Sequence, residues 1–179
     1  MRTRDLTLVV LDRPRHTQLL ANIRATGARI RLIPHGDVLS TIMAGMDEFE
    51  SVQVLMGTGG VTEGVVGACA VRCLGGDMQG RFWPRDEAEE RLLHDEGFQR
   101  ERVLGVDDLC SSKDVSLALT RISDIDLVEG VQYSRARIRT HSLAMRSRSH
   151  SLRWIHTSHG VEWLRESGRL LALQDPEDD

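Results

Sequence analysis

The chain has 179 residues, of which 40% are hydrophobic and 28% charged, and this length suits one globular domain with a sizeable core. Asp and Glu number 27 against 23 Lys and Arg, so the net charge of −4 argues against general nucleic-acid binding. No apolar run reaches the length of a membrane span and no secretory signal opens the chain, so we expect neither nucleic acid nor a membrane as a partner.

The first third of the chain predicts strands that each end in a polar loop followed by a helix. The stretch 5–11 is nearly all apolar, as in a strand that is buried on both faces of a parallel sheet. The predicted elements in order are strand 5–11, a helix ending at Gly27, strand 29–34, helix 38–44, strand 52–56 and helix 65–74. Because ligands of open α/β sheets bind at the carboxyl ends of the strands, these loops should converge on one crevice.

The cysteines give a prediction about the cellular compartment. The three cysteines, Cys69, Cys73 and Cys110, cannot all pair internally. Cys69 and Cys73 lie one helical turn apart on an apolar face, and a zinc site would need more nearby ligands. We therefore expect buried free thiols and a reducing, cytoplasmic location.

From residue 77 onward the pattern changes to short strands and charged segments. The predicted elements are strand 77–83, a charged helix 86–96 with Ala88, Leu92 and Leu93 toward the core, a crossover 103–109, strand 115–122, basic strands 131–133, 138–145 and 152–156, and a helix 160–173. The basic strands are typical of antiparallel hairpins with one exposed face. The expected fold class is α/β, a mixed sheet with helices packed on it, over 1–173, followed by a disordered acidic tail at 174–179.

The glycine loop between strand 52–56 and helix 65–74 is the strongest candidate site. Backbone N–H groups at a helix N-terminus favour a bound anion, and glycines let a phosphate approach the backbone closely. Glu63 falls in the first helical turn, where its carboxylate can hold a divalent cation against a phosphate. A plain tight turn with a capping carboxylate is an alternative that stays open, because the loop is neither a dinucleotide fingerprint nor a Walker A motif.

Two further loops carry side chains that suit a phosphorylated sugar. Arg13 and Arg15 flank Pro14, and two guanidiniums on a stiff backbone suit a phosphate, although a solvated basic turn is the alternative. His35 and Asp37 can bind sugar hydroxyls, whereas the alternative for Asp37 is a helix N-cap.

Later basic and imidazole side chains carry weaker signals. His156 and His159 stand three residues apart without an evident third metal ligand, so surface histidines are the better interpretation. The basic run 135–153 is interpreted as a solvated sheet face.

A series of long motifs in fixed order resembles the class II fructose-1,6-bisphosphatases of bacteria. These motifs are LDRPRH, GARIRLI, MGTGGVTEGV, RCLGGDMQGR, WPRDEAE, VDDL and THSLAMRS. The resemblance extends to about His159. It implies a layered sugar-phosphatase α/β sandwich and hydrolysis of the 1-phosphate of fructose 1,6-bisphosphate with Mn2+ or Mg2+, in gluconeogenesis and glycerol metabolism.

The resemblance also implies site residues in the three loops. The substrate-binding residues are Arg13, Pro14 and Arg15 for a phosphate, then His35, Gly36 and Asp37, and finally Gly60, while Glu63 is a metal ligand. The family usually has Asp-Gly-Asp at 35–37, so His35 replaces a fixed negative charge with an imidazole.

The family enzyme is about twice as long, and its N-terminal half carries most of the metal-ligand acids and the groups that activate water. The chain is therefore expected to be the C-terminal half, with its catalytic residues in the other half, and to be inactive alone. Fructose 1,6-bisphosphate is the expected ligand, and the expected protein partner is a second copy or an N-terminal half. A non-catalytic sugar-phosphate-binding remnant and a subunit of a split enzyme are the alternatives.

Overall fold

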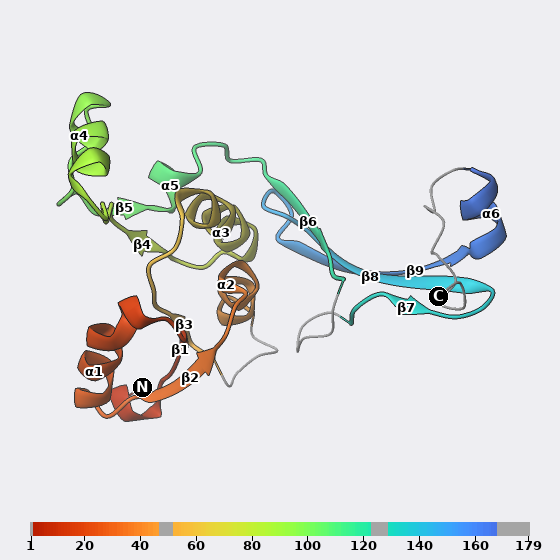
Figure 1. Ribbon diagram of the computed structural model, residues 1–179, viewed down its shortest axis with the longest axis horizontal. Coiled ribbons are helices and arrows are strands. Elements are labelled where there is room, and N and C mark those ends of the chain that lie inside the picture. Colours follow the sequence, from red (N-terminus) through yellow and green to blue (C-terminus); the bar gives the residue numbers. More distant parts are fainter. Residues whose placement is uncertain (1, 47–51, 123–128, 168–179) are drawn as a thin grey trace, which may run out of the picture. The chain divides into compact units, whose positions relative to one another are not determined.

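The computed structural model describes residues 2–46, 52–122 and 129–167, and they fall into two compact units (Figure 1). Unit 1 runs to residue 117 and includes 145–151, and unit 2 combines 118–144 with the residues from 152 onward. The predicted α/β class is confirmed, because helices and both parallel and antiparallel strands are present. A single domain over 1–173 stays a prediction, and the acidic tail 174–179 lies outside the described residues.

Unit 1 is built on a parallel sheet with strand order β2-β1-β3. Strand β1 (Thr7–Leu11) is central, β2 (Arg29–Ile33) pairs along its whole length, and β3 (Val54–Leu55) is short. Val10 is completely buried, as the apolar run predicted for a strand that is covered on both faces.

One face of this sheet packs against helix α1 (Thr17–Ala25), which follows the short 3-10 helix η2 (Pro14–His16). Leu8 and Val10 form a buried cluster with Leu20 and Ile23 of the helix. These helix positions are three residues apart and therefore share one face. The helix is followed by Gly27 at φ +77°, a left-handed conformation that glycine adopts without strain.

Helices α2 (Asp37–Ala44) and α3 (Val61–Leu74) pack against each other in unit 1. A Cβ placed on Gly67 would lie 3.6 Å from the side chain of Thr41, which is ordinary van der Waals contact, so the two helices meet closely at this glycine. Helix α3 begins at residue 61 rather than 65, because Gly60 forms its N-cap directly after the glycine loop.

The rest of unit 1 contains a two-stranded antiparallel sheet and two helices. These elements are β4 (Gln79–Gly80), α4 (Glu87–Asp95), β5 (Leu104–Gly105) and α5 (Val106–Leu109). The prediction that Leu92 faces the core was wrong, since Leu92 is 60% exposed and no residue of α4 is buried. Ala88 is exposed as well, and Leu93 is half-buried, so the predicted apolar stripe is covered only in part.

A four-stranded sheet follows, in which β8 (Arg137–Arg146) is paired with β6 (Ser116–Thr120), β7 (Gln132–Tyr133) and β9 (Ser151–Gly160). The predicted antiparallel pairing is present between β7 and β8. The final helix α6 spans Val161–Glu166, and the remainder of the predicted helix 160–173 lies outside the described residues from 168 on. Among the described helices, none combines the length and hydrophobicity needed to cross a membrane.

Candidate functional site

His16 holds the first loop against the glycine loop at the carboxyl edge of the unit 1 sheet. Its ring is only 1% exposed, with Nδ1 lying 2.8 Å from the carbonyl oxygen of Leu11 at the end of β1. The amide N–H of Thr58 donates to Nε2 at 2.9 Å. Because Nε2 accepts, the proton must be on Nδ1, which donates to Leu11. One neutral imidazole therefore fixes the glycine loop to the central strand.

The two arginines of the first loop are exposed, as a phosphate anchor requires. Arg15 donates from Nε to the carbonyl oxygen of Thr58 at 2.9 Å, a second link between this loop and the glycine loop. Arg13 donates from Nη1 to the neighbouring carbonyl oxygen of Asp12 at 3.1 Å. Pro14 occupies the first position of η2, where its missing N–H leaves no hydrogen bond unmade.

The second loop, at the end of β2, turns on a left-handed glycine. Gly36 has φ +95° and is the N-cap of α2, so Asp37 is the first helical residue rather than the cap. The alternative of Asp37 as an N-cap is thereby excluded, although its Oδ1 accepts from the N–H of Val38 at 3.1 Å. His35 is exposed.

Asp37 and Glu63 both border the glycine pair of the third loop. A Cβ placed on Gly59 would lie 3.0 Å from Oδ2 of Asp37, and one on Gly60 would overlap Oε2 of Glu63. The absence of side chains at these glycines lets both carboxylates lie against the loop backbone. Residues from the ends of β1, β2 and β3 thus meet at one edge of the sheet, which is the geometry expected of a parallel arrangement.

This edge offers groups of both charge signs around a helix N-terminus. The exposed guanidiniums and the start of α3 suit an anion, and the carboxylate oxygens suit a hard cation such as Mg2+ or Mn2+. In the described ranges, no group of three or more His, Cys, Asp or Glu side chains is placed to hold a metal ion. The donor set therefore fits part of a metal site rather than a complete one.

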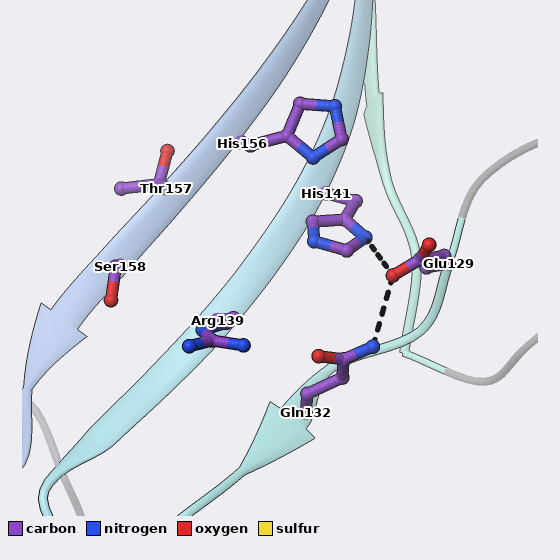
Figure 2. Close-up of a pocket in the computed structure, with 7 residues that line it drawn as sticks. All are labelled: Glu129, Gln132, Arg139, His141, His156, Thr157 and Ser158. Atoms are coloured by element: carbon purple, nitrogen blue, oxygen red, sulfur yellow. Dashed lines mark hydrogen bonds and ion pairs between the residues drawn. The ribbon is translucent and has the colours of Figure 1, made fainter.

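Unit 2 contains a separate polar hollow of about 350 Å³ on the sheet face (Figure 2). It is lined by Glu129, Gln132, Arg139, His141, His156, Thr157 and Ser158. The interpretation of 135–153 as a solvated face did not anticipate this cluster, because its lining comes from separate strands.

Glu129 is the centre of the polar contacts in this hollow. Its Oε2 accepts from Nε2 of Gln132 at 2.9 Å and lies 3.0 Å from Nδ1 of the largely buried His141, without hydrogen-bond alignment to that nitrogen. The rings of His141 and His156 have centroids 4.5 Å apart. His156 and His159 stand on a strand, where residues three apart point to opposite faces, so they do not form a chelating pair.

The comparison with known proteins decides which family this chain belongs to. Residues 1–159 match the family model described as "Bacterial fructose-1,6-bisphosphatase, glpX-encoded". The chain belongs to this family of bacterial fructose-1,6-bisphosphatases. The resemblance inferred from the sequence motifs is thereby confirmed.

Curated relatives agree with this family membership. The chain is 38% identical over 156 residues to the D-fructose 1,6-bisphosphatase class 2/sedoheptulose 1,7-bisphosphatase of Synechococcus sp. (strain JA-3-3Ab). It is 35% identical over 156 residues to the protein of the same name from Gloeobacter violaceus (strain ATCC 29082 / PCC 7421). Each match covers 80% of this chain and 45% of the relative, so the chain spans about half the length of the bisphosphatases it matches.

Proposed function

We propose that this chain supplies the substrate-binding loops and one metal ligand for hydrolysis of the 1-phosphate of fructose 1,6-bisphosphate, giving fructose 6-phosphate in gluconeogenesis. One observation carries the proposal. Arg15, Asp37 and Glu63, from three separate loops, are gathered around the glycine loop at one edge of the sheet. Family membership supports the reaction, and the gathering of the three loops is consistent with the roles that the family resemblance implies for their residues.

Each loop has a physical task in this proposal. Arg13 and Arg15 bind one phosphate of the substrate, since a guanidinium donates parallel hydrogen bonds to phosphate oxygens. Asp37, with His35 and Gly36, binds sugar hydroxyls. Gly60 leaves room for the substrate next to the N-terminus of α3, where backbone N–H groups favour an anion.

Glu63 is the proposed ligand of a divalent cation, Mn2+ or Mg2+. When bound, such an ion polarises the phosphate and makes a coordinated water more acidic. Glu63 lies in the first turn of α3, near the helix N-terminus at which we propose that the phosphate binds. The further acids that complete the metal site are proposed to come from an N-terminal half, in the same protein or in a partner.

In two alternative proposals, the chain binds the sugar phosphate but does not catalyse its hydrolysis by itself. The chain is then either a sugar-phosphate-binding remnant or a subunit of a split enzyme. Having only part of a metal-ligand set in the described residues favours them over an independent phosphatase. A cytoplasmic location is proposed because the cysteines are free thiols.

Phosphate release from fructose 1,6-bisphosphate tests the proposal. The chain is assayed with Mn2+ alone and after mixing with the N-terminal half of the Synechococcus relative, with sedoheptulose 1,7-bisphosphate as a second substrate. Activity that appears only with both halves supports the proposal. Binding of fructose 1,6-bisphosphate without activity in either sample indicates a remnant, and failure to bind overturns the proposal.

The role of Glu63 is tested in the active pair. Glu63→Gln keeps the size and removes the charge, and by analogy with other metal-site perturbations it should lower activity about 10- to 100-fold. Raising Mn2+ should partly restore the rate. Glu87→Gln is the matched control, because Glu87 also lies in the first turn of a helix but far along the chain from the glycine loop. Equal rates for both variants at limiting Mn2+ would remove Glu63 from the metal site.

A further inference from the structure

Two thiols of unit 1 meet although they are far apart in sequence. Cys69 lies in the middle of α3 and Cys110 directly follows α5, and their Sγ atoms are 3.4 Å apart. Both are free cysteines. Helices α3 and α5 pack together, and Figure 1 shows them adjacent in the upper part of unit 1.

The backbone around Cys110 is fixed to α3 by an arginine. Arg72 lies three residues after Cys69 and donates from Nη2 to the carbonyl oxygen of Cys110 at 2.8 Å. The same guanidinium pairs with Asp107 of α5. The amide of Cys110 in turn donates to the carbonyl of Val106 at 2.9 Å. The approach of the two sulfurs is therefore set by several contacts and does not depend on side-chain rotation alone.

The distance to be closed is small. A disulfide has an S–S bond of about 2.0 Å, so the sulfurs must approach by roughly 1.4 Å. Rotations about the two Cα–Cβ bonds supply movements of this size. Cys69 is partly exposed, so a small reagent can reach it, whereas Cys110 is buried.

We propose that Cys69 and Cys110 form a reversible intramolecular disulfide, a covalent modification site separate from the sugar-phosphate loops. The oxidant is a small-molecule disulfide such as oxidised glutathione. The thiolate of Cys69 attacks one of its sulfurs and releases one glutathione thiolate. The thiolate of Cys110 then attacks the Cys69 sulfur of the mixed disulfide and releases the second. Two protein thiols are oxidised, one glutathione disulfide is reduced to two thiols, and the protons pass to solvent.

Cys73 is the third thiol and is not the partner. It is 1% exposed, and its Sγ lies 3.6 Å from the carbonyl oxygen of Val115. Its burial prevents direct attack by a reagent of the size of glutathione. Cys73 is therefore the internal control for the pair.

The environment of Cys69 controls the rate at which its thiolate attacks the oxidant. Burial, together with the hydrogen bond to Cys110, raises the pKa of the Cys69 thiol to about 11. Few molecules carry the reactive thiolate at neutral pH, so bridging is slow there and accelerates as the pH rises.

The bond would link α3 to the segment after α5. Glu63 lies in the first turn of the same α3 helix, so the bridge would tie the helix that carries it to a second part of unit 1. This inference does not rest on the proposed function, because only thiol positions enter the argument.

Incubation of the native chain with oxidised glutathione, followed by non-reducing peptide mapping by mass spectrometry, tests the proposal. We expect a peptide pair linked through Cys69 and Cys110, reversed by dithiothreitol. Cys73→Ser should give the same link, and Cys69→Ser should give none. Formation should be about tenfold faster for each pH unit between 8 and 10.

Three results would overturn the proposal. They are a persistent mixed disulfide of Cys69 with glutathione, a link that involves Cys73, or three unmodified thiols after oxidation at pH 10. Mapping of the unsubstituted chain decides between these results even if a serine variant does not fold.

Discussion

Replacing His16 with alanine should loosen the glycine loop, because this one ring bonds both the end of β1 and the loop amide. The ring is almost completely buried, so His16→Ala leaves a cavity that costs about 2 kcal/mol. The carbonyl of Leu11 loses its side-chain partner in the interior, which costs a further 1–3 kcal/mol or so. The amide of Thr58 is half-buried, so water replaces part of its bond. The expected loss of unfolding free energy is about 3–5 kcal/mol, at the upper end for one substitution.

Urea denaturation of the chain and amide hydrogen exchange measure this effect. The Thr58 amide should exchange much faster in His16→Ala. The matched control is His35→Ala, in which an exposed histidine of a neighbouring loop is removed, and its stability should change by less than about 0.5 kcal/mol. A loss below about 1 kcal/mol for His16→Ala, with unchanged protection of Thr58, would refute the role of His16 as the link between β1 and the glycine loop.

Three further predictions follow from the described contacts. Gly60→Ala should displace the Glu63 carboxylate and weaken Mn2+ binding in the active pair. Gly64→Ala, where a Cβ meets open space, should instead add up to about 1 kcal/mol of stability. Isothermal titration and denaturation compare the two variants, and equal Mn2+ affinity would contradict the reasoning. The rate at which iodoacetamide alkylates Cys69 should be low at pH 8 and rise steeply up to about pH 11, because the pKa of its thiol is raised from 9.0 to about 11. A rate that levels off near pH 9 would argue against the buried thiol pair. The chain alone should release negligible phosphate from fructose 1,6-bisphosphate, and Mn2+-dependent turnover above about 1 per second would show that it needs no second half.

The meeting of the three loops at one edge of the unit 1 sheet could be predicted, because it follows from parallel strands. Once 5–11, 29–34 and 52–56 are strands of one parallel sheet, their following loops must lie at the same edge, and the structure places them there. The substrate and metal roles of residues in those loops stay predictions, since they came from the family resemblance.

Contacts between distant residues could not be predicted in the same way. The sequence places His16 beside a strand end, but its burial depends on a glycine loop that lies 42 residues further along the chain. The sequence predicted that Cys69 shares a helix face with Cys73, but it gave no sign that the Cys69 sulfur lies 3.4 Å from that of Cys110. Helical periodicity placed Leu92 on the apolar face of its helix, but periodicity does not say whether another element covers that face.

The crowding between Gly60 and Glu63 has an evolutionary consequence. A side chain at residue 60 would collide with the Glu63 carboxylate in its present position, so that carboxylate would have to turn away. Because the clashing oxygen is the end of a flexible side chain, an acid at 63 and a side chain at 60 can coexist in one protein. Substitutions at the two positions are therefore coupled through the direction of the carboxylate, and a descendant with a side chain at 60 would keep the acid but present it differently.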